Sequence, residues 1–363
     1  MLDYTELPNG WQIKTLSEVC APSSSNIAFK DVKDKKGDYP IYGASGIVAY
    51  SDFYSKEKEC IGIVKDGSVG KIFILPAKSS VISTLNYLEN FDDLNIKYLY
   101  YFLHCINFKK YIKGSVIPHI YFRDYKKEKI PLPPLATQKQ IAERLDFLFD
   151  KIDKALKLLN ENKEYIKKYR LSILKDAFEG KLTRPSKNWE QSTFEECLQY
   201  EQPTKYIVKS TKYNNNYKTP VLTAGKSFIL GYTNETDGIF TQTPVIIFDD
   251  FTTDTKFVDF HFKVKSSAMK ILMPNGKADI KFLYYLMQII YHRSDTHKRY
   301  WISEYSKIKI TIPPLEIQKE IVSILDTKFK SMEEIERLNN ENIENLLLLK
   351  KSLLKEAFSG KLI

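Results

Sequence analysis

The chain has 363 residues, which is enough for two or three folding units with real cores. Its 43% hydrophobic content, with 14 Gly and 15 Pro, excludes a disordered, collagen-like or low-complexity protein. The formal net charge is +10, and 24 Tyr and 21 Phe accompany the excess of Lys and Arg, a balance that suits a polyanion carrying phosphates and flat bases.

Cysteine usage and the short apolar stretches bear on location. Four cysteines, at positions 20, 60, 105 and 197, form no CxxC pair, which argues against a disulfide scaffold and a cysteine zinc site. The first ten residues have no apolar core, and the longest apolar stretches, 282–290 and 346–349, are too short to span a membrane. We therefore expect a protein of the reducing cytoplasm.

The first 131 residues predict a globule of mixed α and β structure. Cys60–Val64 indicates a buried strand and Tyr98–Phe108 a helix. Between them, Lys65–Lys71 superficially resembles a phosphate-binding loop, but only two residues separate its glycines and no Ser or Thr follows the last lysine. We expect a tight hairpin here rather than a nucleotide site, and its backbone amides could approach a DNA phosphate.

A long helix is predicted from residue 138 to 178, about 60 Å at 1.5 Å per residue. Apolar residues recur there at heptad spacing, at Leu145, Ile152, Leu159, Ile166 and Ile173. Thr137 and Gln140 suggest a capping box at its start, and Gly180 suggests a left-handed closing residue. Because the helix greatly exceeds the usual globular length, its apolar seam requires a partner.

Residues 189–311 predict a second mixed globule, with a strand at Pro244–Phe248 and a helix at Ile280–Tyr291. The acidic cluster that follows this strand could hold a nuclease metal, although a polar loop is the favoured interpretation. Its members are Asp249, Asp250, Asp254 and Lys256. The five histidines show no spacing typical of a zinc site, so no metal or catalytic residue is predicted.

The two halves are repeats. A shift of 180 positions places residues 130–182 on 310–362 without a gap, with 23 identities in 53 pairs. The second copy therefore predicts a second long helix that begins near Pro313-Pro314 and ends before Gly360. Its own apolar row is Leu325, Met332, Leu346 and Leu353.

Connectivity predicts how the two helices pair. A globule of about 120 residues has a radius of gyration near 14 Å, so its ends cannot lie about 60 Å apart as parallel helices would require. We therefore expect an antiparallel coiled coil with approximate two-fold symmetry. Asn162 and Asn342 occupy equivalent places on the seam, where they could fix the register or lie exposed.

Cationic and aromatic segments precede each long helix, and together with the glycine-rich turn and further polar residues of each half they supply the candidate binding residues. Cations suit phosphates and guanine edges, and hydroxyls suit base edges. The candidates in the first half are Lys65, Ser68, Lys71, Lys113, Ser115, His119 and Tyr121. Those in the second half are Lys226, Ser227, Thr252, Lys256, Arg293, His297, Lys298, Arg299 and Tyr300.

The arrangement resembles the specificity subunit of type I restriction-modification enzymes over essentially the whole chain. The likeness rests on Leu7-Pro8-x-Gly10-Trp11, on the 66–70 turn, on Ile130-Pro131-Leu132-Pro133-Pro134-Leu135-x-x-Gln138 and on Ala177-Phe178-x-Gly180-Lys181-Leu182, with the second copy at 310–362. One departure is Ala136-Thr137-Gln138 and Glu316-Ile317-Gln318, where the family more often has a Glu-Gln pair.

This resemblance implies a non-catalytic reader of double-stranded DNA. Each of two target recognition domains would read one half of a bipartite, asymmetric sequence. The paired helices would set the gap and dock two modification (methyltransferase) subunits, which restriction subunits would join. No cofactor is expected on this chain, because S-adenosylmethionine, ATP and Mg would be bound by the partners.

The expected fold class is therefore α+β, with two mixed α/β target recognition domains separated by two long helices. The expected boundaries are 1–131 for the first domain, 132–182 for the first helical spacer, 183–188 for a linker, 189–311 for the second domain and 312–363 for the second spacer. Two alternatives stay open: a nuclease or modifying enzyme that uses the cluster from Asp249 to Lys256, and a coiled-coil scaffold that binds no DNA.

Overall fold

The computed structural model describes residues 7–183, 188–223, 227–290 and 299–363. These residues form two compact units, one of Met1–Asn160 with Asn340–Ile363 and the other of Glu161–Asn339. Each unit combines one globule with part of both long helices. The predicted α+β class, with two mixed globules and two long helices that pack together, is confirmed.

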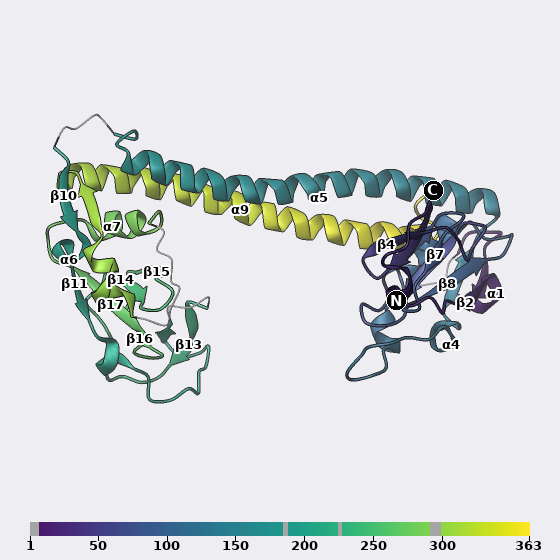
Figure 1. Ribbon diagram of the computed structural model, residues 1–363, viewed down its shortest axis with the longest axis horizontal. Helices are drawn as coiled ribbons and strands as arrows, with labels where there is room; N and C mark the ends of the chain where they lie inside the picture. Colours follow the sequence, from purple (N-terminus) through teal and green to yellow (C-terminus); the bar gives the residue numbers. More distant parts are fainter. Residues whose placement is uncertain (1–6, 184–187, 224–226, 291–298) are drawn as a thin grey trace. The chain divides into compact units, whose positions relative to one another are not determined.

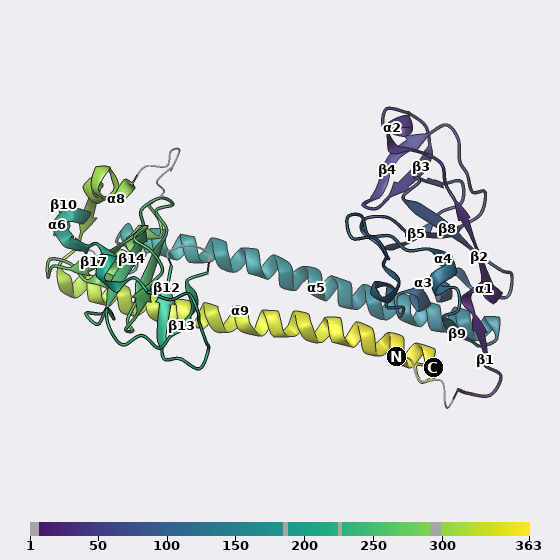
Figure 2. The same cartoon turned by 90° about the horizontal axis from the view of Figure 1, so that it is seen from below.

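The globule of the first unit contains two sheets and a two-stranded ribbon (Figure 2). The larger sheet has the order β2 (Cys20–Ser24), β8 (Leu85–Asn90), β5 (Cys60–Val64) and β6 (Ile72–Leu75). The smaller sheet has the order β4 (Gly46–Ser51), β3 (Tyr39–Gly43) and β7 (Ser80–Val81), and the ribbon pairs β1 (Gln12–Thr15) with β9 (Lys129–Leu132). The helices are α1 (Leu16–Val19), α2 (Phe29–Val32), α3 (Ile96–Leu103), the 3₁₀ turn η1 (Phe108–Tyr111) and α4 (Phe122–Tyr125).

The globule of the second unit repeats this plan. Its larger sheet has the order β11 (Leu198–Glu201), β17 (Met269–Pro274), β14 (Val245–Asp249) and β15 (Thr255–Val258). Its smaller sheet has the order β13 (Ile229–Thr233), β12 (Thr219–Leu222) and β16 (Lys263–Val264), and its ribbon pairs β10 (Glu190–Thr193) with β18 (Lys309–Ile312). The helices are α6 (Phe194–Cys197), η2 (Pro203–Tyr206), α7 (Ile280–Met287), α8 (Tyr300–Ser303) and η3 (Tyr305–Lys307).

The strand orders match element for element, so the duplication extends through both globules and not only through the helices. In each case a strand buried along all or nearly all of its length lies inside the larger sheet, β5 in one unit and β14 in the other. Each of these strands turns back into an antiparallel neighbour. The connections β5–β6 and β14–β15 are therefore equivalent positions, although their sequences differ.

The helices α3 and α7 are shorter than the sequence indicated. The pattern predicted a helix through Phe108, but α3 ends at Leu103. The carboxamide of Asn107 accepts a hydrogen bond from the backbone of Lys109 and begins η1, a local alternative that short polar side chains offer the backbone. In the second half α7 ends at Met287, before the predicted limit.

The long helices are α5 (Leu135–Phe178) and α9 (Leu315–Phe358), each of 44 residues (Figure 1). The predicted capping box at Thr137 is wrong, because α5 already begins at Leu135, behind Pro133 and Pro134. Both helices close as predicted, with Gly180 and Gly360 at φ +72°. In each, the amide three residues beyond the helix reaches a carbonyl of the last turn, Lys181 to Asp176 in the first copy.

The two helices run antiparallel within each unit. In the first, Ile141 and Leu145 near the start of α5 share a core with Ala357 and Phe358 at the end of α9. In the second, Ala177 at the end of α5 shares a core with Ile321 near the start of α9. Of the predicted seam residues, Leu159, Leu346 and Leu353 are half-buried. The remaining six are buried, namely Leu145, Ile152, Ile166, Ile173, Leu325 and Met332.

Asn162 and Asn342 are both exposed, which is the second of the two placements that the sequence left open. Asn162 does donate across the helices, from Nδ2 to Oδ1, but its partner is Asn339, 3.4 Å away and 4% exposed. Asn342 is the repeat equivalent of Asn162. In an antiparallel pair, residue numbers rise along one helix and fall along the other. Equivalent residues of the two copies therefore face each other only at one point, and Asn162 lies away from that point.

Gly180 and Gly360 form a matched pair for testing the helix ends. A β-carbon at Gly360 would lie 2.4 Å from Cγ of Pro8, whereas one at Gly180 would meet nothing closer than Cζ2 of Trp189 at 3.6 Å. We predict that Gly180→Ala lowers the free energy of unfolding by about 1 kcal/mol through the left-handed backbone alone. Gly360→Ala should lower it further, because Pro8 must move. Denaturant titration followed by circular dichroism measures both, and equal losses would contradict the contact with Pro8.

Candidate nucleic-acid interface

In the first unit, two segments that lie far apart in the sequence are joined by backbone hydrogen bonds. The basic turn, residues 65–71, connects β5 with β6, and the binding loop, residues 112–121, leads into α4. The amide of Gly67 donates to the carbonyl of Pro118 over 2.9 Å, and the amide of Ile120 donates to the carbonyl of Lys65 over 2.9 Å. The turn and the loop therefore form one surface.

The binding loop closes on itself. Lys113 and His119 exchange two backbone hydrogen bonds of 2.8 Å each, which pinches residues 114–118 into a short hairpin. Gly114 adopts φ +85°, and a β-carbon there would lie 2.4 Å from the carbonyl oxygen of Ile117. Only glycine fits this bend without rearrangement, so the local sequence fixes the shape of the loop.

This surface collects every binding residue that the sequence predicted in the first half. They are Lys65, Ser68, Lys71, Lys113, Ser115, His119 and Tyr121. Ser68, Lys71 and Ser115 are exposed. The glycine-rich turn selected the first three of them and the duplicated segment before the helix selected the rest, and the hydrogen bonds between turn and loop bring them together.

Several of the cations are already oriented by neighbours. Lys113 forms an ion pair of 2.9 Å with Asp124, and Nζ of Lys71 donates to the carbonyl of Ala44 over 3.1 Å. The exposed guanidinium of Arg123 lies 4.4 Å from the ring centre of Tyr121, which is 38% exposed. Sequence reasoning missed Arg123, although its position two residues after Tyr121 in a basic segment was a usable signal. A stacked guanidinium beside an aromatic ring can contact phosphate or a base edge.

The second unit makes the equivalent connection. The turn between β14 and β15 contains Thr252, and the amide of Tyr300 donates over 3.0 Å to the carbonyl of Asp250 in that turn. Tyr300 stands 180 positions after Ile120, whose amide makes the matching bond to Lys65. The same hydrogen bond thus attaches the segment before the helix to the hairpin turn in both halves.

Only some of the binding residues predicted in the second half are accessible in the structure. Ser227, Thr252 and Arg299 are exposed and Lys256 is half-buried. Tyr300 is a correction: it is 3% exposed and packs inward, so its ring has no face to offer a base. Four further predicted residues, Lys226, Arg293, His297 and Lys298, lie outside the described residues.

The side chains of the acidic cluster considered as a nuclease site stabilise the fold. Asp250 is 1% exposed, forms an ion pair of 3.2 Å with the equally buried Lys270, and accepts the amide of Trp301 over 2.9 Å. The carboxylate of Asp249 accepts the amides of Phe251 and Thr252 and so shapes the turn. Among the described residues, no group of three or more His, Cys, Asp or Glu side chains could hold a metal ion. The nuclease interpretation loses its basis.

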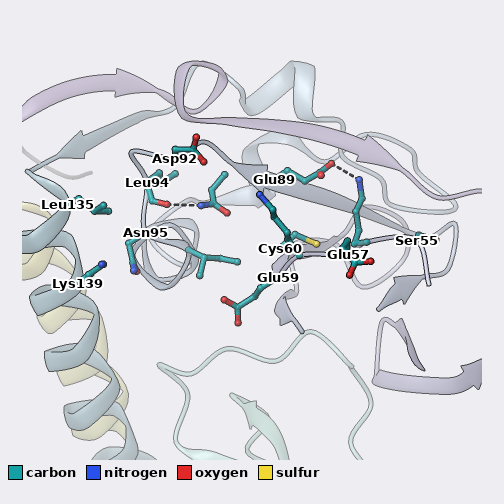
Figure 3. Close-up of a pocket in the computed structure, with 14 residues that line it drawn as sticks. Ser55, Glu57, Glu59, Cys60, Glu89, Asp92, Leu94, Asn95, Leu135 and Lys139 are labelled. Carbon is teal, nitrogen blue, oxygen red and sulfur yellow. Dashed lines mark hydrogen bonds and ion pairs between the residues drawn. The ribbon is translucent and has the colours of Figure 1, made fainter. Parts of the chain in front are cut away.

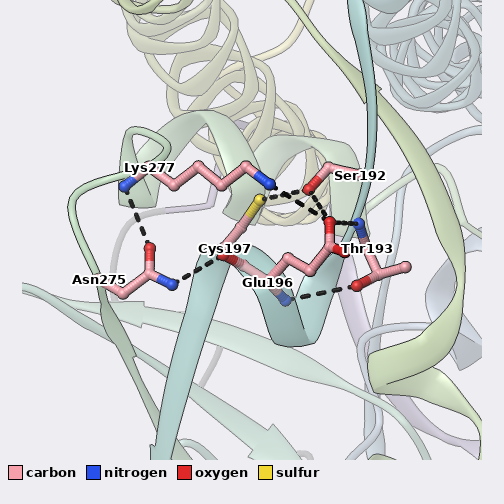
Figure 4. A network of polar contacts seen from close by, with 6 residues as sticks. All are labelled: Ser192, Thr193, Glu196, Cys197, Asn275 and Lys277. Atoms are coloured by element: carbon pink, nitrogen blue, oxygen red, sulfur yellow. Dashed lines mark hydrogen bonds and ion pairs between the residues drawn. The ribbon is translucent and has the colours of Figure 1, made fainter.

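A second cluster with reactive side-chain types is also structural. Figure 4 shows the carboxylate of Glu196 next to Ser192, Thr193 and Lys277. The hydroxyl of Ser192 donates to it over 2.7 Å, and this bond is the main reason that the pKa of Glu196 lies below its usual value. Burial raises the pKa of the neighbouring Cys197, which is fully buried and so remains an inert thiol. The cluster fastens α6 to the connection after β17.

A cavity of about 770 Å³ in the first unit carries a small excess of acidic side chains. Glu57, Glu59, Glu89 and Asp92 line it, beside the first turn of α5 (Figure 3). Lys56 is paired with Glu89. Lys58 and Lys139 also line the cavity, so four carboxylates face three lysines and the cavity attracts phosphate less than the cations of the turn and loop do.

Each globule is fastened to its long helix through a buried glutamine. Oε1 of Gln138 accepts the amide of Asn95 over 2.8 Å, and its Nε2 donates to the carbonyls of Pro133 and Asp93. Gln318 repeats the pattern, accepting the amide of Asp279 over 2.8 Å and donating to Pro313. Both glutamines are 1% exposed. The amide therefore joins the start of the long helix to the start of α3 or α7.

A second attachment lies two turns further along each helix. The carboxylate of Asp146 accepts the hydroxyl of Tyr101 over 2.5 Å and pairs with Lys97, both on α3. Asp326 accepts the hydroxyl of Tyr285 and pairs with Lys281 on α7 over 2.7 Å. Burial, and then the bond to the carboxylate, raises the pKa of each tyrosine. We call each glutamine and aspartate pair, Gln138 with Asp146 and Gln318 with Asp326, the helix lock.

The described part of the chain contains no helix long and apolar enough to cross a membrane.

Gln138→Ala tests the helix lock. The change leaves the amide of Asn95 without its buried acceptor, and we predict a loss of about 2 kcal/mol in the free energy of unfolding. Gln140→Ala is the matched control, because Gln140 is exposed on the same turn of α5 and should change stability by less than about 0.5 kcal/mol. Denaturant unfolding of both variants makes the comparison, and equal effects would show that the lock carries no stability.

Comparison with known proteins supplies an independent view. The family described as type I restriction modification DNA specificity domain matches residues 8–167 and 186–345. The specificity subunit of the type I restriction enzymes EcoR124I/EcoR124II from Escherichia coli is 53% identical over 151 residues, which are 38% of this chain and 37% of that protein. The MjaX specificity subunit of Methanocaldococcus jannaschii, itself a tentative assignment, is 26% identical over 96% of this chain and 95% of its own.

The fold has a solved counterpart. A chain from structural work on complex assembly and conformational transition of the type I R-M system superimposes with a TM-score of 0.74. The match covers 98% of this chain and 99% of the other at 16% sequence identity. At that identity the likeness concerns the fold alone, and it includes both globules and both long helices.

Proposed function

This chain belongs to the type I restriction-modification DNA specificity family, and on that premise we propose that it reads a bipartite, asymmetric DNA target with one globule per half-site. It does no chemistry itself and directs partner subunits to the target. The observation that carries this proposal is the duplicated attachment of a hairpin turn to the segment before each long helix, Lys65 to Ile120 and Asp250 to Tyr300. Two copies of one surface suit two half-sites.

In the first half-site, the cations of the basic turn and binding loop contact the phosphates. Lys65, Lys71 and Lys113 supply the charge, and Arg123 adds a guanidinium beside the ring of Tyr121. Ser68, Ser115 and His119 are the candidates for base edges, because their short polar side chains lie on the same surface. Phosphate contacts set affinity and position, while base contacts set the sequence.

The second surface differs enough to read another sequence. Its turn holds Asp250 and Asp254, after Asp249 at the end of β14, where the first half has two lysines, so its cations come from elsewhere. The candidates are Ser227, Thr252, Lys256 and Arg299, together with Lys226, Arg293, His297 and Lys298, which lie outside the described residues. Unlike surfaces on one duplicated framework lead to an asymmetric target.

We assign the segments accordingly. Residues 1–131 and 189–311 are the target recognition domains, 132–182 and 312–363 are the helical spacers, and 183–188 are a linker. The seam of α5 and α9, from Leu145 to Ile173 and from Leu325 to Leu353, holds the spacers together. Because both helices pass from one unit into the other, their length sets the gap between the half-sites.

Two modification subunits dock on the spacers. Leu158 of α5 and Leu338 of α9 are repeat equivalents, and they are 65% and 44% exposed. Tyr169 and Leu349 are likewise equivalent, and they are 56% and 45% exposed. A duplicated pair of exposed apolar side chains suits two copies of one partner.

The remaining components belong to the partners. S-adenosylmethionine is bound by the modification subunits, and ATP and Mg by the restriction subunits that join them. We place the assembly in the cytoplasm, where the four free cysteines of this chain stay reduced.

A double charge reversal tests the DNA surface. With the modification partner present, Lys65→Glu and Lys113→Glu together should weaken binding to the target and lower the slope of log affinity against log salt by about 1 for each phosphate that is no longer neutralised. Lys58→Glu is the matched control, because Lys58 is an exposed lysine of the same globule that lines the acidic cavity. Gel shifts at several salt concentrations measure both. A complex that binds the target equally well with either variant would refute the interface.

A further inference from the structure

The tip of the binding loop presents apolar side chains to solvent. Val116 is 90% exposed and Ile117 is 62% exposed. Val116 is the most exposed large apolar side chain in the described part of the chain. A contiguous apolar pair held in water costs free energy unless a binding partner covers it.

Hydrogen bonds hold the loop that carries this tip in a defined conformation. The two hydrogen bonds between Lys113 and His119 close its base, and Pro118 accepts the amide of Gly67 from the basic turn. Gly114 allows the bend that brings residues 116 and 117 to the outside. The chain leads from this hairpin directly into α4, whose position is marked in Figure 1.

The surroundings of the tip identify its partner by charge. Lys113 and His119 stand at the base of the hairpin, the basic turn is bonded to it, and Lys109 and Lys110 lie exposed just before it. Lys113 is paired with Asp124, but an apolar protein partner would still have to cover the exposed Lys71, Lys109 and Lys110. A nucleic acid neutralises them with phosphates and still offers the apolar faces of its bases.

We propose that Val116 and Ile117 form a wedge that enters between two adjacent base pairs of the half-site read by the first globule. The inference rests on the proposed function and adds a mode of reading to it. Apolar side chains that enter a base step partly unstack it and kink the duplex. The cost of that deformation depends on the sequence at the step, so the wedge selects flexible steps without hydrogen bonds to the bases.

The second half lacks this feature in its sequence. The shift of 180 residues that equates the bonded pair Ile120 and Tyr300 places Thr296 and His297 opposite Val116 and Ile117. Two polar residues do not form an apolar wedge. One half-site should therefore be unstacked at a defined step while the other is not, which gives the experiment an internal reference.

The test uses duplexes that carry 2-aminopurine at successive positions of both half-sites, with the full chain and its modification partner at saturating concentration. The base that the partner methylates is left unsubstituted. Native protein should brighten the probe at one step of the first half-site, and Val116→Ser with Ile117→Ser should abolish that signal and weaken binding about tenfold. Ile13→Ser is the matched control, because Ile13 is 46% exposed on β1, which pairs with β9 and not with the binding loop.

The outcomes separate this inference from the proposed function. Specific binding without increased 2-aminopurine fluorescence at any step, or with the same fluorescence in the double variant, would overturn the wedge. Either result would leave the proposed DNA-reading function intact. If replacing thymine by uracil in the half-site reproduces the whole loss, the tip contacts a methyl group and the wedge is again wrong. A native complex with no sequence-specific binding would overturn the proposed function itself.

Discussion

The interaction on which the rest depends is a buried glutamine amide at the first turn of each long helix. Gln138 and Gln318 satisfy the backbone amide of the residue that caps α3 or α7 and a proline carbonyl just before their own helix. Since an amide in a dry site has few alternative partners, it fixes one orientation of the globule on the helix. Asp146 and Asp326 repeat the constraint two turns on. A spacer can set the distance between two binding surfaces only if each surface is held rigidly on the helix, and this joint holds it so.

Duplication explains why the constant and the variable parts of the chain are separated. The helix locks, the helix ends at Gly180 and Gly360 and the order of strands are the same in both halves. The hairpin turns and the loops before the helices differ, most visibly in Lys65–Lys71 against the acidic turn of the second half. These segments lie on the surface and carry little of the core, so they can change without loss of the fold. Specificity can therefore diverge on an unchanged framework.

The sequence predicted the features that are periodic or local. Heptad spacing located both long helices, glycine located their ends, and chain closure gave their antiparallel sense, which each unit confirms. Features that depend on tertiary register were missed. Gln138 reaches a backbone amide 43 residues away, and Asn162 meets Asn339 rather than its repeat equivalent. Tyr300 shares a short segment with the exposed Arg299, and in so few residues no periodicity separates a buried ring from an exposed one.

The central claim is that the paired helices set the distance between two unlike readers. Inserting four residues after Asn160 and four after Asn340 lengthens both helices by about 6 Å, close to two base-pair steps of about 3.4 Å. Methylome sequencing of cells that carry this chain with its modification partner reads the target directly. The account predicts the same two half-sites with a gap about two base pairs longer. An unchanged gap, or a methylated sequence with no gap at all, would contradict it.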